Sequence, residues 1–528
     1  MLAPRSRIPH GLTSNRRPRS LTSMNLRSSS LRAKAYLSTC LWLSLGLLTR
    51  LAARAGGAGG HSSGGHSSSH GSSHGSSSFG GSSYHSSGGS SGGGSIGGFF
   101  CFLIFIIIIF VLIVVFLSNK KSSPPAPPAS DIAEPDIDSN SLAAFIAAHP
   151  DFNVVAFNAK VRSAFLKIQA AWTAQDISHI RQFISDGMYQ RFATQFRMMA
   201  LLKQQNRLDQ IEILNVEPVS ARTDGPFEVI DVYVEASMHD AFVCELDHSL
   251  DTEGDDAFVE YWSFIRKRGA GNANCDIFDN TNCPSCGAAL PKDMGELCKC
   301  PYCQVMVNSG EFDWVLAEIT QQADYGGNSR MSRIIAPQLP ASIAEIAPEC
   351  PDFSTQLVED KASNAFMQIM TALATRSPAS VRRFVSDETF ARISAMITDR
   401  NIIFDRIYLN ESVLLNAERA GAKHRLAIGL SCTKQRVELL PGNRLAPIDP
   451  EEITTGHVLL MERDANAVPE KGSLYQHQCA NCGGAAGDSL DLNCPYCGSP
   501  LNSTRNEWIV TGFITTAEYL GSGAHPQE

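Results

Sequence analysis

Eight of the fifteen cysteines in this chain occur as four Cys-x-x-Cys pairs, a spacing that lets both thiolates of a pair face one metal ion. The pairs fall into two sets, and a short loop separates the two pairs of each set, as in a zinc ribbon. The predicted ligands are Cys283, Cys286, Cys300 and Cys303 in the first set and Cys479, Cys482, Cys494 and Cys497 in the second.

Four cysteine ligands leave no open coordination position on zinc, which favours a structural over a catalytic role. Iron can occupy the same four-thiolate geometry, and a single pair can act in redox exchange, so both remain alternatives. We predict about two structural zinc ions per chain. Cys275 and Cys298 have no counterpart in the second set, and we interpret both as spectators.

The cysteine sets belong to an internal repeat. The tripeptide Pro-Asp-Phe at 150–152 returns at 351–353, an offset of 201, and the offset shortens to 194 between Trp314 and Trp508. A drifting offset with a preserved order of features indicates a duplicated domain with loop deletions. An apolar helix stripe repeats as well, formed by Val161, Phe165, Ile168 and Trp172 in the first copy and by Ala362, Phe366, Ile369 and Leu373 in the second.

Within each copy the sequence predicts helices first and antiparallel strands after, an α+β fold with helices on a curved sheet. Each zinc ribbon is then inserted between the last two strands of its copy. In the first copy we expect helices over 155–173, 177–184 and 186–206, and strands over 211–219, 227–236, 258–266 and 314–321. In the second copy the expected strands are 406–418, 424–438, 456–463 and 507–516.

One stretch, 96–118, predicts a single transmembrane helix, because residues 96–117 are uncharged and almost entirely apolar. Lys120 and Lys121 follow it, so the positive-inside rule places the C-terminal part in the cytoplasm. A reducing compartment favours metal over disulfide for the cysteine pairs. Every acidic residue lies after residue 130, and this acidic part is a poor match for nucleic-acid binding.

The segments before and after this stretch have distinct compositions. Residues 1–55 predict a signal peptide with an extended n-region, although translation from Met24 and a mitochondrial presequence are alternatives. Residues 56–95 are rich in Gly, Ser and His and predict a disordered extracytoplasmic tail, whose histidines either chelate a transition metal or are polar filler. The remaining predicted segments are a Pro-rich linker at 119–142, domain 1 at 143–325 with its ribbon at 275–305, a linker at 326–349, and domain 2 at 350–520 with its ribbon at 477–499.

The first copy resembles the Tim44-like domain family. The resemblance is carried by the helix stretch FLKIQAAW at 165–172, by Asp176, and by Arg-Gln-Phe at 181–183. It covers 145–321 and, more loosely, 350–516. Membrane-bound bacterial members have a similar order of Gly/Ser-rich tail, membrane span and domain. The resemblance implies two cone-shaped domains similar to nuclear transport factor two, which dock on membranes or membrane complexes. The zinc ribbons and the duplication depart from the mitochondrial member of the family.

For catalysis the first copy offers Asp231, Tyr233, His239 and Asp240, with Asp231 and Tyr233 on one face of a predicted strand. The second copy has Ala427, Ile428 and Gly429 near the matching place, so we predict that the protein is not an enzyme. We expect a tether or adaptor at the bacterial inner membrane that binds an unidentified protein partner, in protein transport or membrane-protein assembly. The alternatives are a lipid-binding, small-molecule-binding or enzymatic cavity protein, and the mitochondrial inner membrane.

Overall fold

A computed structural model describes residues 137, 139–270, 276–327, 329–467, 479, 481–485 and 490–522. The predicted signal peptide, Gly/Ser/His-rich tail and transmembrane helix lie outside these residues, as does most of the Pro-rich linker. Among the described helices none is both long enough and apolar enough to cross a bilayer. We use the terms N-terminal half for residues 139–325 and C-terminal half for residues 331–522.

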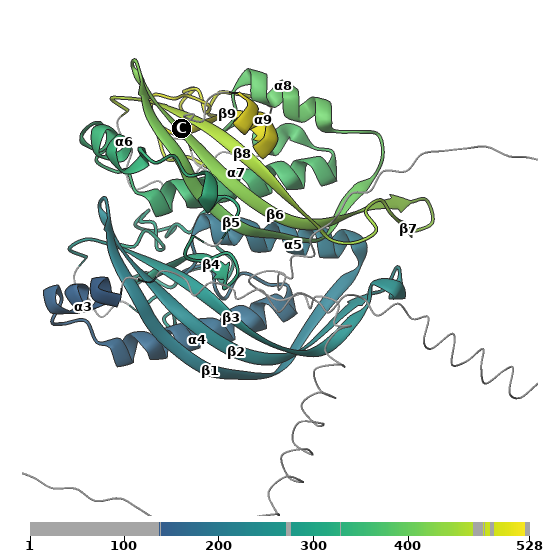
Figure 1. The fold of residues 1–528 in the computed structure, drawn as a ribbon, viewed down its shortest axis with the longest axis horizontal. Coiled ribbons are helices and arrows are strands. Elements are labelled where there is room, and N and C mark those ends of the chain that lie inside the picture. Colours follow the sequence, from purple (N-terminus) through teal and green to yellow (C-terminus); the bar gives the residue numbers. More distant parts are fainter. Residues whose placement is uncertain are drawn as a thin grey trace, which may run out of the picture. The chain divides into compact units, whose positions relative to one another are not determined.

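The N-terminal half is three helices followed by a four-stranded antiparallel sheet in the order β1-β2-β3-β4 (Figure 1). Helix α4 buries Val161, Phe165 and Ile168, the predicted apolar stripe, against this sheet. The elements are α3 (Ser139–Ala148), α4 (Val154–Ala174), α5 (Asp186–Leu202), β1 (Gln204–Asp224), β2 (Phe227–Cys244), β3 (Thr252–Lys267) and β4 (Val315–Gln321).

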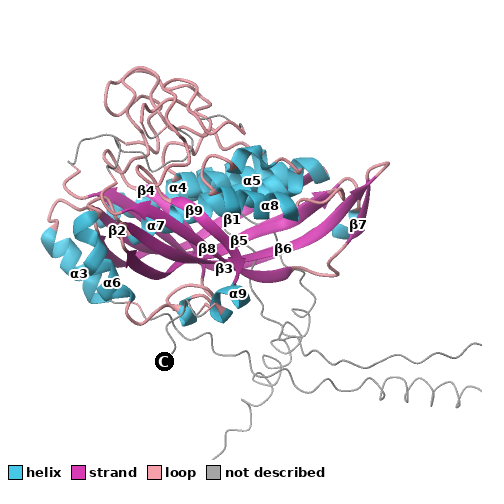
Figure 2. Ribbon diagram, turned by 90° about the horizontal axis from the view of Figure 1, so that it is seen from above, coloured by secondary structure: helices cyan, strands magenta, loops and turns pink. Residues whose placement is uncertain are grey.

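The C-terminal half repeats this order with a sheet β5-β6-β8-β9 and a short strand β7 paired to β6. Figure 2 shows α4, α5, α7 and α8 on one side of the strands, with long loops beyond them. The elements are α6 (Leu339–Ile346), α7 (Thr355–Thr375), α8 (Asp387–Met396), β5 (Ile402–Ala420), β6 (Lys423–Leu440), β7 (Arg444–Pro447), β8 (Ile453–Asp464), β9 (Ile509–Thr515) and α9 (Thr516–Gly521).

The mixed α+β class with antiparallel sheets is therefore confirmed, and the two halves agree in detail. The residues before α5 and α8 each form a parallel bridge to the last strand, Ile184 with Leu316 and Val385 with Val510. A serine caps each of these helices through its side chain, Ser185 for α5 and Ser386 for α8. The cysteine ribbons lie between β3 and β4 and between β8 and β9, as predicted.

Several predicted elements are wrong in extent or type. Residues 177–184 form turns with i to i+3 hydrogen bonds, because the chain must turn here to reach the bridge at Ile184. Helix α5 ends at Leu202, since Lys203 adopts a left-handed conformation at φ 51°, and β1 starts immediately afterwards. The predicted linker at 326–349 contains helix α6, which packs on β5.

The first three long strands of each sheet are also longer than the hydrophobic alternation indicated, whereas the last strands β4 and β9 lie within their predicted ranges. The first residues of β1 alternate between buried and exposed, but the first two buried members, Gln204 and Asn206, are polar. Gln204 donates to Asp405 Oδ1 at 2.8 Å, and Asn206 accepts from the Trp172 indole at 3.1 Å. Polar side chains occupy inward positions here because they bond across to other elements, and a hydrophobicity pattern does not register them.

Candidate functional site

The first cysteine set forms a compact cluster of sulfur atoms. Cys283 Sγ lies 3.6 Å from Cys303 Sγ, and Cys286 Sγ lies 3.8 Å from Cys300 Sγ. Each pair sits in a tight turn. In the first pair Gly287 closes the turn, with a φ of +73° and an N–H that donates to the Cys283 carbonyl at 2.9 Å. The fold thus brings together four residues from two turns that are separated in sequence.

The second set repeats this geometry. Cys479 Sγ lies 3.6 Å from Cys497 Sγ, and Cys482 Sγ lies 3.6 Å from Cys494 Sγ. In both sets all four sulfur atoms lie within 4.8 Å of one another. Alternate members are buried and exposed, so one edge of each cluster faces solvent.

These sulfur positions fit a tetrahedral zinc ion. A zinc–sulfur bond of about 2.3 Å places the sulfur atoms of a tetrahedron about 3.8 Å apart, close to the distances in both clusters. A hydrogen bond from the Val305 backbone lowers the pKa of the exposed Cys303 thiol to about 7. The side chain of Ser499 lowers the pKa of Cys497 to about 5. Burial raises the pKa of Cys283 and Cys479 to about 12, so the sulfur spacing is what supports metal binding. Both clusters could bind structural zinc, and the ion would tie the two turns of each ribbon together.

Cys298 is not part of the first cluster. Its thiol is fully buried and donates to the Arg181 carbonyl at 3.5 Å. Burial raises the pKa of this thiol to about 12, so it is protonated at neutral pH. Cys275, the other expected spectator, lies outside the described residues.

The two ribbons contact each other. Lys299, next to the third cysteine of the first ribbon, donates to the carbonyl of Gly483 in the second ribbon at 3.3 Å. Tyr302 and Tyr496 occupy the same position in the two Cys-Pro-Tyr-Cys turns, and 71% and 69% of their surfaces are exposed. Tyr496 packs over Gly484, where an added Cβ would lie 2.5 Å from its ring. One exposed tyrosine, Tyr496, therefore lies next to the contact between the ribbons, and the other, Tyr302, is three residues from Lys299 in the chain.

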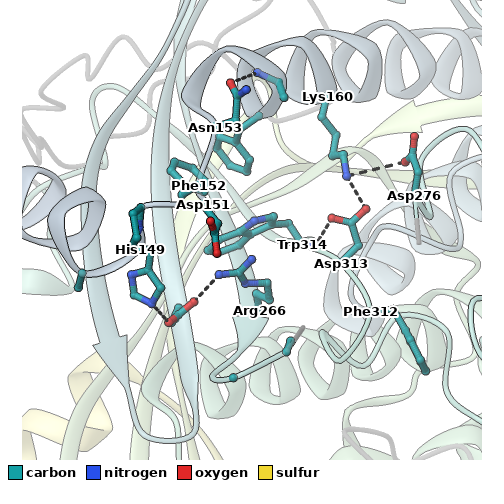
Figure 3. Close-up of a pocket in the computed structure, with 17 residues that line it drawn as sticks. His149, Asp151, Phe152, Asn153, Lys160, Arg266, Asp276, Phe312, Asp313 and Trp314 are labelled. Carbon is teal, nitrogen blue, oxygen red and sulfur yellow. Dashed lines mark hydrogen bonds and ion pairs between the residues drawn. The ribbon is translucent and has the colours of Figure 1, made fainter. Parts of the chain in front are cut away.

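A cavity of about 650 Å³ opens between the start of α4 and the ends of β2, β3 and β4 (Figure 3). Its floor is Trp314, which contacts Phe152 and Phe157 edge-on and carries the Arg266 guanidinium 4.6 Å above its ring. Lys160 forms an ion pair with one carboxylate oxygen of Asp313. The other oxygen of Asp313 accepts from the backbone N–H of Trp314 at 2.8 Å. The cavity therefore combines an aromatic floor with ordered charges. No sequence motif indicated it, because its residues come from five separate stretches of the chain.

The residues considered for catalysis hold structural contacts. Asp231 is buried and accepts hydrogen bonds from Ser220, Ser263, Tyr325 and Arg222. Asp240 is buried and accepts from Asn206 at 2.8 Å, on a different face from Tyr233 and His239. These four residues are not gathered into one site.

A second arrangement, missed in the sequence, links a thiol to a histidine and a carboxylate. Cys350 Sγ lies 3.0 Å from His424 Nδ1, and His424 Nε2 lies 2.9 Å from Glu349. This order is typical of a nucleophile with its base. However, the side chains of Cys350 and His424 are 2% and 0% exposed, and burial raises the pKa of the thiol. We interpret the arrangement as internal packing.

The fold and the two sulfur clusters define a mixed α+β protein with two four-cysteine sites. Residues 139–276 match the family model described as the Tim44-like domain, so the chain carries a Tim44-like domain in its N-terminal half. This confirms the resemblance drawn from the helix and turn residues of that half. A search among curated proteins finds no match.

Proposed function

We propose that the protein is a membrane-anchored adaptor that holds a protein partner through its paired ribbons. The Tim44-like domain supports a binding role associated with membranes. In this proposal 1–55 is a signal peptide, 96–118 spans the inner membrane of a bacterium, and 143–325 and 350–520 are two cone-shaped domains in the cytoplasm. The mitochondrial inner membrane is the alternative location, and protein transport or membrane-protein assembly is the process served.

The exposed tyrosines of the ribbons carry this proposal. The described residues include eight large hydrophobic side chains that are exposed, and three of them, Tyr302, Leu490 and Tyr496, lie on the ribbons. Exposed tyrosines next to other apolar groups are typical of protein-binding surfaces. The direct contact through Lys299 joins the two ribbons that carry them, and in this proposal the three side chains form one surface. Zinc would hold that surface rigid, which lowers the entropic cost of binding a partner.

Photo-crosslinking in native membranes tests the adaptor role. The full-length chain would carry a photoreactive phenylalanine analogue at position 302 or 496, with the same analogue at Leu520, an exposed residue of α9, as a matched control. We expect one recurrent protein adduct from positions 302 and 496 and none from 520. Loss of that adduct in the Cys283→Ser/Cys286→Ser variant would place the interface on the first ribbon.

The same experiment can reject the adaptor role. Adducts of equal pattern at all three positions, or adducts with lipid alone, would contradict it. A variant with both tyrosines replaced by serine tests partner binding separately from zinc binding. It should bind zinc normally but lose the partner, because the tyrosines touch solvent and not the metal.

The cavity above Trp314 supports a second candidate function, the binding of a small molecule or lipid. Its volume of about 650 Å³ lies within the range of ligand sites, and its aromatic floor with a few ordered charges resembles their composition. Co-purified lipid or metabolite that is lost on substitution of cavity residues, without any change in crosslinked proteins, would favour this function over the adaptor role.

A further inference from the structure

The two halves place the same side chains around the tryptophan that precedes the last strand. Arg266 lies 4.6 Å above Trp314, and Arg463 lies 4.9 Å above Trp508. The backbone N–H of each tryptophan donates at 2.8 Å to the acid before it, and that acid pairs with a lysine of the long helix. The corresponding acid and lysine are Asp313 with Lys160 in the N-terminal half and Glu507 with Lys361 in the C-terminal half.

In the C-terminal half the arginine is closed off by a carboxylate of the chain itself. Asp352 accepts from Nη1 and Nη2 of Arg463, each at 2.7 Å, in a bidentate pair. The Arg463 side chain is 2% exposed. Asp352 belongs to the repeated Pro-Asp-Phe tripeptide, so the aspartate at the same place in the N-terminal half is Asp151.

In the N-terminal half this aspartate does not hold the arginine. Asp151 is exposed and makes no ion pair or hydrogen bond with the described residues, although it lies beside Arg266 in Figure 3. Arg266 donates through Nη2 to Glu228 at 2.8 Å, whereas its Nη1 has no partner among the described residues. The Nε atoms of Arg266 and Arg463 are both buried without a partner, so the two halves differ at Nη1. Glu228 is shared with His149 at 2.7 Å. The cavity of about 650 Å³ opens on this incompletely bonded guanidinium.

We propose that this cavity binds a carboxylate group of a ligand on Arg266, in the position that Asp352 takes on Arg463. The ligand carboxylate accepts from Nη1 and lies at the edge of Trp314, while Phe152 and Phe157 receive the apolar or aromatic part next to it. The group can come from a small organic acid or from the carboxyl end of a polypeptide. This inference names the ligand class for the second candidate function and rests on it; it does not depend on the adaptor role.

Asp151 lines the same cavity as the Arg266 guanidinium. Its carboxylate repels an incoming anion and can take the place that the ligand needs. Replacing it with asparagine removes the charge from an exposed position where folding is not at risk. A carboxylate ligand should therefore bind about two- to fivefold more tightly to the Asp151→Asn variant. A cationic ligand would bind more weakly to that variant, because it would lose an opposite charge.

The test uses 4-fluorobenzoate and fluorine NMR on the full-length chain in nanodiscs. We expect saturable binding that tightens in Asp151→Asn, falls at least about tenfold in Arg266→Met, and is absent for neutral 4-fluorobenzamide. Arg266→Met leaves Glu228 with His149 only, so the variant Arg266→Met/Glu228→Gln serves as the second loss variant, with no buried acid left unpaired. Binding to neither the wild type nor Asp151→Asn, or weaker binding to Asp151→Asn, would overturn the proposal.

A second arm separates the two sources of the carboxylate. A tetrapeptide that ends in 4-fluorophenylalanine is compared with its C-terminal amide. Tighter binding of the free-acid peptide than of 4-fluorobenzoate assigns the cavity to polypeptide ends, and the reverse assigns it to small acids. Both arms measure ligand binding to the cavity at Arg266 and use no protein partner. A negative result therefore does not affect the crosslinking test of the adaptor role at positions 302 and 496.

Discussion

Asp360 of α7 caps the helix α5 of the other half. Its Oδ2 accepts from the Gly187 backbone N–H at 3.1 Å, and its Oδ1 accepts from the Ser185 hydroxyl. Helix N-termini carry unpaired N–H groups, so a hydrogen-bond acceptor placed there stabilises the helix. One half thus completes a helix that belongs to the other.

The relationship is reciprocal. Asp224, at the end of β1, accepts from the backbone N–H groups of Thr355 and Gln356 at 2.8 Å each, which caps α7. The helices themselves pack together, and Thr194 and Thr371 bond across the contact at 2.9 Å. Because each half supplies a cap to the other, we expect the halves to unfold in one transition.

The buried acids at this contact make stability depend on pH. Burial raises the pKa of Asp360 to about 7 and that of Glu359 to about 8. An acid with a raised pKa in the folded state contributes stability below its unfolded pKa and loses it as the pH rises through the folded value. Lowering the pH from 8 to 6 should therefore raise the free energy of unfolding by about 1 to 2 kcal/mol for each such acid. Urea denaturation followed by tryptophan fluorescence measures this.

Asp360→Asn provides the control for the pH dependence. Asparagine keeps an oxygen that can accept from the Gly187 N–H but does not titrate. The variant should show a smaller difference in unfolding free energy between pH 8 and pH 6 than the wild type. An unchanged difference would mean that other groups cause the pH dependence.

Gly187→Ala should destabilise the protein by about 1–3 kcal/mol, because the helix cap leaves no room for a side chain. An added Cβ would lie 2.2 Å from Asp360 Oδ1 and 2.7 Å from the Asp360 carbonyl. Gly254→Ala is a matched control, since nothing lies within 4 Å of its added Cβ. Thermal unfolding of both variants compares them directly, and equal midpoints would contradict the crowding argument.

Asp224→Ala should cost about 1–2 kcal/mol, since it removes the acceptor for two helix N–H groups and for the Ser354 hydroxyl. The exposed Asp255, which pairs only with His239 at the surface, is the comparison residue, and Asp255→Ala should change stability by less than about 0.5 kcal/mol. Chemical denaturation at one pH distinguishes the two.

Metal analysis of the full-length chain should find about two zinc ions. Cys286→Ser and Cys482→Ser should each lower the content by about one, because each removes a thiolate from a different cluster. Cys298→Ala should retain both ions, since Cys298 lies outside the clusters and bonds to Arg181. A folded chain without zinc, or loss of zinc in Cys298→Ala, would refute the assignment.

Asp352→Ala should lower the free energy of unfolding by about 3 kcal/mol, because it leaves Arg463 buried without its bidentate partner. Added formate or acetate should restore part of the stability by taking the place of the lost carboxylate, and chloride at equal ionic strength should restore less. Thermal unfolding with increasing salt shows the difference. Equal effects of the three anions would contradict a specific carboxylate position on Arg463.

The sequence predicted the parts of the fold that depend on apolar periodicity and on repetition. The stripe of α4 and the last strand at Val315–Gln321 follow it closely, because these residues are buried by one rule along one element. Residues 177–184 do not follow the prediction. Asp176 accepts a hydrogen bond from the Ser178 N–H and starts a turn where the apolar pattern predicts a helix. Helix α6 was missed because its eight residues follow no long apolar repeat.

The candidate sites divide in the same way. Cysteine spacing is local information, and it identified all eight sulfur positions that gather in the two clusters. The cavity on Trp314 depends on residues more than a hundred positions apart, such as Lys160 and Asp313, whose pairing only the folded chain reveals. Single residues in such a site carry no signature, because lysine and aspartate are common on any surface.

The position of the ribbons sets an order on folding. Each ribbon separates the last strand of a half from its neighbour, so closing the ribbon lowers the entropic cost of joining β4 or β9 to its sheet. Until then β3 and β8 are open edges with unpaired backbone groups, a known route to aggregation. Glu318 of β4 also pairs with Arg191 of α5 at 2.6 Å. A newly made chain that lacks metal would therefore be slow to complete either sheet and to form the ion pair between Glu318 and Arg191. Quality-control proteases can recognise such an incompletely folded state.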